Sequence, residues 1–501
     1  MTMKSLQIHN QQTVPTENIP VFSYADFYNH VLEIAAAETV HCVSYFGYEV
    51  AEGLHFICCL ADDGDASIHI LSWKTSQKEL VVESLTDKNL TFYMYEREIH
   101  ENFGIHFEGH PWLKPVRYAW NRKDIEKTIA NYPFFRIESE ELHEVGVGPI
   151  HAGIIEPGHF RFICNGEKIM HLEIQLGFQH RGVENLFLTK NKLNERIALS
   201  ESIAGDTACG HSSAFAFLWE SLCDYQASEA VVWQRNVAME LERIAIHTGD
   251  LAAICTDVAY QLGNAVMGRL RTPMVNFFQE WCGNRLGKSL VRPFGSFYEF
   301  TPQLNERLQK VFAAYEPDFN EMWDRIKTLP SLLSRLEKTG ALTKAQVQEI
   351  GTVGIPARMA GLNRDIRSSH PYGLFKKTEH LPEIKHHGDV LSRTQLRKEE
   401  IHQSIGYLKD WLYKMPRHID FTSVVLKPQP SSFTISLTEG WRGEICHCAL
   451  TDKEGKLIAY KIKDPSMHNW LALALAVRNN EISDFPINNK SFNLSYCGFD
   501  L

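Results

Sequence analysis

Apolar and polar positions divide the chain into a short mixed region and a longer helical one. Residues 24–38 space their apolar groups as a helix does. Two strand-like runs follow, HFICCLA at 55–61 and SIHILSW at 67–73, on either side of the turn-forming DDGD at 62–65. This order of elements predicts a small α+β domain at the start of the chain.

Helical spacing dominates from residue 200 onward. Apolar residues from 228 to 263 recur close to the helical period, which predicts one long helix at the centre of a bundle. Ser228 is a favourable first residue for that helix, and Gly263 is a favourable last one. Two further stretches, 305–338 and 389–413, predict long amphipathic helices.

The tail of the chain returns to strand-like patterns and completes the fold prediction. Its three runs lie at 433–440, 444–452 and 456–464. We therefore expect an α+β protein of two domains. A small α+β domain occupies 1–120, and a large, mainly helical domain with a β-containing rim occupies 146–501. The polar segment 121–145 is predicted to link them.

Composition and charge narrow the range of functions. Apolar residues make up 44% of the 501 positions and charged residues 22%, as in typical globular proteins. The net charge of -10 gives no electrostatic support for a nucleic-acid partner. The chain has no uninterrupted apolar run of about 18 residues, and its first residues lack the apolar core of a secretory signal. We expect a cytoplasmic chain without a membrane span.

The eleven cysteines are scattered along the sequence, and no C-x-x-C pair occurs. In a reducing compartment this pattern predicts buried free thiols. An iron–sulfur cluster held by this chain alone is not expected, because ligation by four cysteines normally shows tight spacing.

Two motifs lie near the predicted domain boundary. YEREIHENFGIHFEGHP at 95–111 combines charges, histidines and turn glycines but places no nucleophile beside a base, so we interpret it as a solvated loop suited to docking. In VGPIHAGIIEPGHFRF at 147–162, Glu156 precedes a stiff Pro-Gly turn. A carboxyl held there could relay protons. The alternative is a β-hairpin with polar surface groups.

Further polar motifs follow in the second domain. FQHRGVENL at 178–186 places His180 four residues before Glu184, which predicts a local ion pair. Clustered arginines at 354–373 predict an ion-pair network or an anion site. The stretch ESIAGDTACGHSSAF supplies His211, and a single histidine is more often structural than catalytic.

In this order the motifs resemble one family. The end of the first domain resembles the 30-kDa subunit of respiratory complex I. From 148 onward the chain resembles the large subunit of membrane-bound, group 4 NiFe-hydrogenases and the homologous 49-kDa subunit of complex I. The fusion of both domains resembles the large subunit of formate hydrogenlyase. The matching segments are GPIHAGIIEPGHFRF, HRGVENL, ELERIAIHTGDLAA, GNRLGKSLVRPFGSF, GTVGIPARMAGLNRDIRSSHPYG, GDVLSRTQLR, EGWRGE and KDPSMHNW.

The resemblance implies a changed metal site. Hydrogenases of this family hold nickel and iron with two C-x-x-C pairs, because soft thiolates suit these metals. The corresponding positions here are Ala204 and Thr207 in the early segment, and Ser495 and Gly498 in the late one. The chain therefore looks like the energy-converting-hydrogenase-related group, which lacks the nickel ligands, and no NiFe centre is expected.

Other positions of the family's sites are retained. Glu156 matches the proton-relay glutamate of hydrogenases, and Arg442 matches the arginine over their metal site. With His211, they are the expected proton-relay or cavity residues. His151 matches a histidine in the quinone-site loop of complex I, and Phe215 replaces the tyrosine of that site. The expected cavity also includes Arg181, Glu201 and Arg358.

We therefore expect a peripheral subunit on the inner face of the cell membrane, in a complex-I-like oxidoreductase related to energy-converting hydrogenases. Its expected partners are a small iron–sulfur subunit and membrane-arm subunits. A quinone or another acceptor would take the place of the metal. The alternative is a non-redox scaffold or coupling subunit of a complex that moves ions or inorganic carbon. A functional hydrogenase is not expected.

Overall fold

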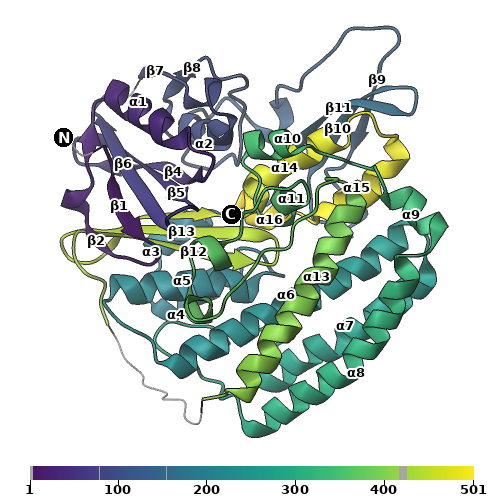
Figure 1. Cartoon of the computed structure of the whole chain (residues 1–501). Helices are drawn as coiled ribbons and strands as arrows, with labels where there is room; N and C mark the ends of the chain where they lie inside the picture. The colour runs from purple at the N-terminus through teal and green to yellow at the C-terminus, as the bar shows by residue number, and fades with distance from the viewer. Residues whose placement is uncertain (1–3, 78, 154, 417–425) are drawn as a thin grey trace.

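A five-stranded sheet forms the frame of the first domain. The computed structural model describes residues 4–77, 79–153, 155–416 and 426–501. The strands follow the order β1-β6-β5-β4, with β3 beside β6 (Figure 1). The bounds are β1 Leu6–His9, β3 Val21–Phe22, α1 Tyr24–Ala35, β4 Val40–Val50, β5 Gly53–Asp62, β6 Ser67–Thr75 and α2 Tyr93–Phe103. The predicted helix and both predicted strands are confirmed.

The two faces of this sheet have different neighbours. One face packs against α1 and α2 through residues such as Phe27, Tyr45 and Phe56. The other face, which includes Val43 and Ile57, shares a hydrophobic core with the second domain. The first domain is thus joined to the second by packing as well as by the chain.

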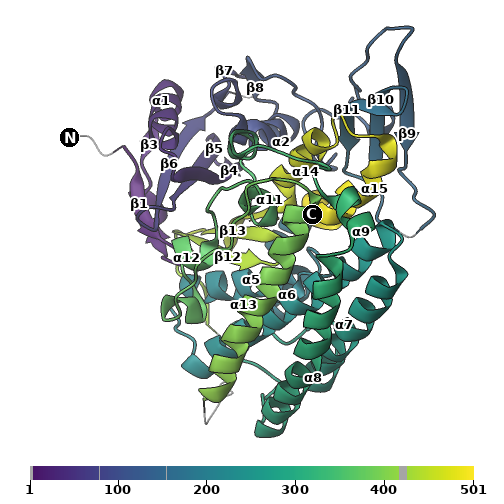
Figure 2. The same cartoon turned by 45° about the vertical axis from the view of Figure 1, so that its right-hand side comes forward.

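A bundle around α6 forms most of the second domain. This helix lies against α5, α7, α13 and α15 (Figure 2), which confirms a central bundle helix. The Ser228 side chain accepts a hydrogen bond from the Val231 N–H and caps the start of α6, as predicted. The bounds are α5 Ala208–Leu222, α6 Glu229–Asp257, α7 Gln261–Cys282, α8 Pro302–Ile326 and α13 Val390–Tyr413.

Two predicted helices are shorter than expected. The helix over 228–263 ends at Asp257, because Ala259 takes a left-handed conformation with φ of 58° and turns the chain into α7. Gly263 lies inside α7. The helix over 305–338 is divided into α8 and α9, because Leu329 precedes Pro330 and is extended, as residues before proline prefer.

A buried antiparallel sheet lies between the first domain and the bundle. Its strands follow the order β14-β13-β12-β2, so the N-terminal β2 pairs with β12 of the second domain. Every residue of β12 and β13 is buried. The three predicted C-terminal strands are confirmed. The bounds are β2 Val14–Pro15, β12 Ser432–Gly440, β13 Gly443–Thr451 and β14 Leu457–Lys463.

The remaining elements complete the rim. A three-stranded sheet, β11-β10-β9, projects beside α14 and α15 (Figure 2). The segment 121–145 contains one short 3-10 turn, Ile129–Asn131, and its last residues begin β9. The bounds are β7 Val81–Glu83, β8 His106–Glu108, β9 His143–Val147, β10 His159–Asn165, β11 Lys168–Gln175, α3 Val183–Thr189, α4 Leu193–Ser200, α9 Pro330–Leu336, α10 Lys344–Ile350, α11 Ile355–Arg358, α12 Ile366–Ser369, α14 Ser466–Ala476, α15 Phe485–Phe492 and α16 Tyr496–Asp500.

The motif at 95–111 is not a solvated loop. Most of it forms α2, which ends at Gly104 in a left-handed conformation, and three of its carboxylates are buried. Glu96, for example, accepts hydrogen bonds from the Ser84 hydroxyl and the Leu85 N–H. The charges of the motif suggested an exposed loop, because the hydrogen-bond partners of its buried carboxylates are not evident in the sequence.

The prediction of buried free thiols is met in the structure. All cysteines are free thiols, and all but the half-buried Cys497 are buried. Among the described residues, none of the helices has the length and apolar character needed to cross a bilayer.

Candidate functional site

Two turns from opposite ends of the second domain meet at one junction. The first, 204–207, precedes α5, and the second, 495–498, begins α16. The Arg181 guanidinium holds them together by donating to the Ile203 carbonyl at 3.1 Å and to the Cys497 carbonyl at 3.0 Å. The four positions that correspond to metal ligands, Ala204, Thr207, Ser495 and Gly498, all lie on these turns.

Arg442, between β12 and β13, fills this junction. Its guanidinium binds both carboxylate oxygens of Asp206, at 2.6 and 2.7 Å, and donates to the Thr207 hydroxyl at 3.0 Å. It also donates to the Asn493 carbonyl at 2.6 Å and lies over the Trp441 ring. Burial alone would lower the pKa of Arg442, but the Asp206 carboxylate raises it, so the guanidinium is charged.

A buried chain of polar side chains leads away from the junction. Asp464 Oδ2 lies 3.0 Å from His211 Nε2, His211 Nδ1 lies 3.1 Å from His447 Nε2, and His447 Nδ1 lies 2.8 Å from the Tyr460 hydroxyl. All four residues are nearly inaccessible to solvent.

One set of tautomers satisfies every bond in this chain. Tyr460 donates to His447, His447 donates to His211, and His211 donates to Asp464. Burial lowers the pKa of His447 well below its usual value, so its imidazole is neutral. Burial would raise the pKa of Asp464, but His211 and the nearby Arg442 lower it, so its carboxylate is ionised. In this arrangement every donor of the chain points toward Asp464, and burial raises the pKa of the Tyr460 hydroxyl well above its usual value.

Glu156 lies beside the second of these turns, next to Cys497. It is half-buried on the turn before β10. Burial and the neighbouring Glu156 charge raise the pKa of the Cys497 thiol to about 11. The Cys497 sulfur is 3.5 Å from the Ser495 hydroxyl. Glu156, His211 and Arg442, which were selected from the sequence, thus surround the same pair of turns.

The residues expected to line a cofactor cavity are more dispersed. Glu201 is buried and accepts from the Ser289 N–H, and burial raises its pKa. His151 Nε2 lies 2.8 Å from the Gly158 carbonyl oxygen. Phe215 is enclosed by aromatic rings, among them Phe187 at 5.5 Å.

The clustered arginines form an ion-pair network in the bundle. This was one of the two predicted alternatives, the other being an anion site. Arg358 contacts Glu400, and Arg367 donates to Asp365 at 2.7 Å. Arg243 of α6 donates to Glu400 at 3.2 Å and to the Gly440 carbonyl at 3.1 Å. The network therefore reaches the hairpin that carries the site arginine.

The predicted pair of His180 and Glu184 is wrong. Glu184 accepts from the Ile462 N–H at 2.8 Å and lies 3.1 Å from the Lys461 ammonium group. His180 instead contacts the Asp500 carbonyl at 2.7 Å. The pair fails because Gly182 is left-handed and α3 begins only at Val183, so the two residues do not share a helical face.

Sequence reasoning missed three members of the polar chain. Asp464 lies in the segment KDPSMHNW, which contributed to the resemblance but was not interpreted chemically. His447 lies between the two cysteines of CHC at 446–448, which was examined only for thiol spacing. Tyr460 had no local signal, because its role depends on the pairing of β13 with β14.

Comparison with known proteins identifies the class to which this architecture belongs. The family described as respiratory-chain NADH dehydrogenase, 30 Kd subunit, matches residues 22–127. The family described as respiratory-chain NADH dehydrogenase, 49 Kd subunit, matches residues 257–430. The chain is thus a fusion of a 30-kDa-type domain and a 49-kDa-type domain of complex I.

Individual relatives extend this result to hydrogenases. The carbon monoxide-induced hydrogenase of Rhodospirillum rubrum is 27% identical over 346 residues, which cover 69% of this chain and 95% of that protein. Formate hydrogenlyase subunit 5 of Escherichia coli K12 is 27% identical over 430 residues, covering 81% and 74%. An NADH-quinone oxidoreductase subunit of Dehalococcoides mccartyi BAV1 is 26% identical over 344 residues, covering 68% and 93%. The chain is a complex-I-like subunit related to both groups.

Proposed function

We propose that this chain is the peripheral proton-handling subunit of a membrane-bound, complex-I-like oxidoreductase, attached to the inner face of the cell membrane. The observation that carries the proposal is the chain from Tyr460 through His447 and His211 to Asp464, which ends beside Arg442. A buried relay that ends beside a fixed cation suits the delivery of a proton to a group that gains electrons. The relatives include subunits of hydrogenases and of NADH-quinone oxidoreductases.

We infer that the junction holds no NiFe centre, because its residues do not fit one. Thr207 and Ser495 are hydroxyls, and the Thr207 oxygen already accepts from Arg442. A side chain at Gly498 has no room, since a Cβ built there would lie 2.6 Å from Asp464 Oδ2. Among the described residues, no three His, Cys, Asp or Glu side chains are placed to hold a metal ion.

An electron acceptor would reach the junction from the side of Asp206 and Glu156. The Asp206 side chain is 38% exposed, although its partner Arg442 is buried. A quinone is the acceptor class that the relatives' names indicate. Arg442 would stabilise negative charge on a reduced carbonyl oxygen, and the relay ending at Asp464 would supply the proton.

A partner subunit would dock on the rim next to Glu156. Large apolar side chains are exposed there on β9–β11 and on the segments beside them. They are Phe135, Ile137, Ile150, Ile155 and Met170. Exposed apolar side chains in such numbers are typical of protein interfaces. A small iron–sulfur subunit at this surface would bring electrons to the junction, and membrane-arm subunits would complete the complex.

Capture of the native complex tests the assembly. The chain would be tagged in its host, captured from gently solubilised membranes, and its partners identified by mass spectrometry. We expect a small partner with closely spaced iron–sulfur cysteines together with membrane subunits. Membrane subunits without any iron–sulfur partner would overturn the redox proposal.

Substitution of the relay tests proton delivery. In the captured complex, His447→Phe should lower the turnover rate of the complex by about ten-fold or more. It should also increase the solvent deuterium isotope effect on that rate. Thr248→Val is the matched control, because it removes a buried hydrogen bond to Tyr315 in the bundle, away from the relay. An unchanged isotope effect in His447→Phe would refute a relay role, even if turnover fell.

One observation favours the second candidate, a non-redox coupling or scaffold subunit of a complex that moves ions or inorganic carbon. Phe215 stands where the quinone site of complex I has a tyrosine, so the phenol of that site is absent here. The Phe215 ring is fully enclosed in an apolar cluster. If this candidate is correct, the captured complex contains no reducible iron–sulfur signal.

A further inference from the structure

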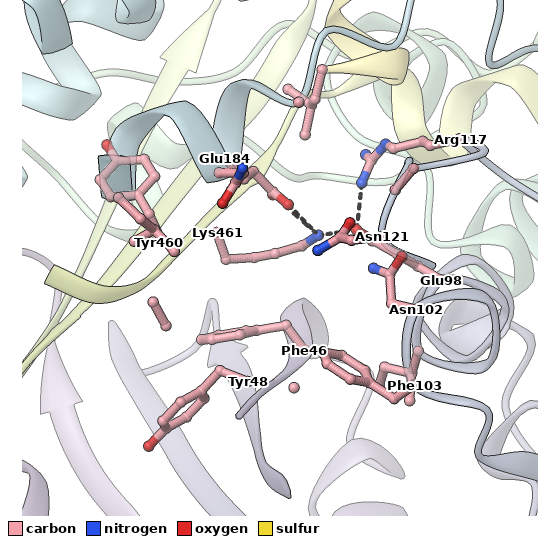
Figure 3. Close-up of a pocket in the computed structure, with 18 of the residues that line it drawn as sticks. Phe46, Tyr48, Glu98, Asn102, Phe103, Arg117, Asn121, Glu184, Tyr460 and Lys461 are labelled. Carbon is pink, nitrogen blue, oxygen red and sulfur yellow. Dashed lines mark hydrogen bonds and ion pairs between the residues drawn. The ribbon is translucent and has the colours of Figure 1, made fainter. Parts of the chain in front are cut away.

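A cavity lies between the two domains, and Tyr460, at the far end of the polar chain, is among the residues that line it. Its volume is about 530 Å³, within the range of small-molecule sites. The first domain contributes β4 and α2, and the second contributes α3 and β14. Figure 3 shows charged and amide side chains on one side of this interdomain pocket and aromatic rings on the other.

The charged side is a balanced cluster around Glu98. Its carboxylate contacts Lys461 and accepts from the Arg117 guanidinium at 2.6 Å, and Lys461 lies 3.1 Å from Glu184 (Figure 3). Burial would raise the pKa of Glu98, but Arg117 and Lys461 lower it to about 2, so it is ionised. Two carboxylates thus face two cations, and the cluster carries no net charge.

The pocket offers a hydrogen-bond acceptor on His180. This residue lines the pocket, and its Nδ1 lies 2.7 Å from the Asp500 carbonyl, so Nδ1 carries the proton and Nε2 is an acceptor. Burial lowers the pKa of His180, which keeps the ring neutral.

The opposite side suits a flat ring. Phe46, Tyr48 and Phe103 lie across the pocket from Lys461 (Figure 3). The carboxamides of Asn102 and Asn121 lie at the edge of the charged cluster and offer both donors and acceptors. Aromatic walls with convergent polar groups at one edge are typical of sites for planar ligands.

We propose that the interdomain pocket binds a neutral, planar heterocycle with N–H donors on its edge, the chemistry of a purine nucleoside. The ring would stack on the aromatic side chains, and its N–H groups would donate to His180 Nε2 and to the carboxamide oxygens of Asn102 and Asn121. A phosphorylated ligand is disfavoured, because Arg117 and Lys461 are already paired with carboxylates. An organic cation would lie beside these two cations, but the exposed Glu49 carboxylate also lines the pocket, and spermidine is therefore a comparison ligand in the test.

Calorimetric titration of the purified full-length chain with adenosine tests the proposal. We expect saturable binding that Leu188→Trp weakens by about ten-fold or more, because this bulkier side chain fills the pocket. Asn121→Leu should weaken binding by about three- to ten-fold through loss of a hydrogen bond. Leu262→Trp, at a 49% exposed position on α7 outside this pocket, should bind as the unmodified chain does.

Several results would overturn the proposal. They are no adenosine binding at millimolar concentration, undiminished binding by a folded Leu188→Trp chain, and tighter binding of ATP or spermidine than of adenosine. Thermal unfolding of each variant establishes that it is folded, and Asn121→Leu provides the test if Leu188→Trp is not. None of these outcomes depends on turnover of the complex, so they are independent of the proposed function.

Discussion

Removal of the charge on Glu400 should destabilise the bundle strongly. This carboxylate is fully buried and contacts Arg358, Arg243 at 3.2 Å and His247 at 2.6 Å. Burial and nearby Asp365 raise the pKa of Glu439 well above its usual range, so that acid is protonated. The network therefore balances three arginines against three ionised acids. These are Arg243, Arg358 and Arg367 against Glu240, Asp365 and Glu400.

Glu400→Gln leaves one buried cation without a counter-charge, which typically costs about 3–5 kcal/mol. We expect about 3 kcal/mol, because Glu439 can ionise and replace part of the lost charge. With a urea slope of at least about 3 kcal/mol per molar for a chain of this size, the unfolding midpoint should fall by about 0.5–1 M. The neighbouring pair of Lys398 and Glu399 is partly exposed, so Glu399→Gln should cost less than about 1 kcal/mol.

The assay is urea unfolding of the purified chain, followed by circular dichroism at constant pH and salt. A midpoint for Glu400→Gln within about 0.2 M of that of Glu399→Gln would refute the reasoning. It would mean that the network tolerates an unbalanced charge, and that the ion pairs contribute little to holding α6 against α13.

Two further predictions concern the start of α5 and the turn of α16. Burial raises the pKa of Glu242 to about 8, where it accepts from the Cys209 and Gly210 N–H groups. Its folded form therefore holds a proton that the unfolded form releases, and its stabilising contribution should fall by about 1.4 kcal/mol per pH unit from pH 4.5 to pH 8. Glu242→Gln should lose less stability over this range, and parallel pH curves for both chains would contradict the prediction. Gly498→Ala should cost about 1–3 kcal/mol in urea unfolding, because the added Cβ displaces Asp464. Gly268→Ala on α7, where the added Cβ has no neighbour within 4 Å, should be neutral or stabilising, and equal costs for both variants would contradict the steric argument.

Local pattern was sufficient to predict most of the elements. The hydrophobic period identified α1, α6 and α13, and alternation with turn residues identified β5, β6 and the C-terminal strands. Helix ends were less predictable. Ala259 ends α6 through a left-handed conformation that its residue type does not suggest. The proline at 330 was a visible signal of the break that divides α8 from α9.

The candidate site was predictable only in part, since its residues come from distant segments. Glu156, His211 and Arg442 were selected through the resemblance, and the fold brings them to one pair of turns. The relay needs strand pairing between β13 and β14 to place His447 beside Tyr460, and no local motif encodes that contact. The buried carboxylates of α2 likewise depend on partners from other elements, such as Arg117 for Glu98.

The metal content of the captured complex tests the central claim most directly. Nickel and iron would be measured per copy of this chain in the complex isolated from its native membrane. The account predicts iron in excess of the chain, contributed by a partner's clusters, and nickel far below one atom per chain, because Arg442 with Asp206 and Thr207 occupies the junction. One nickel atom per chain would contradict it.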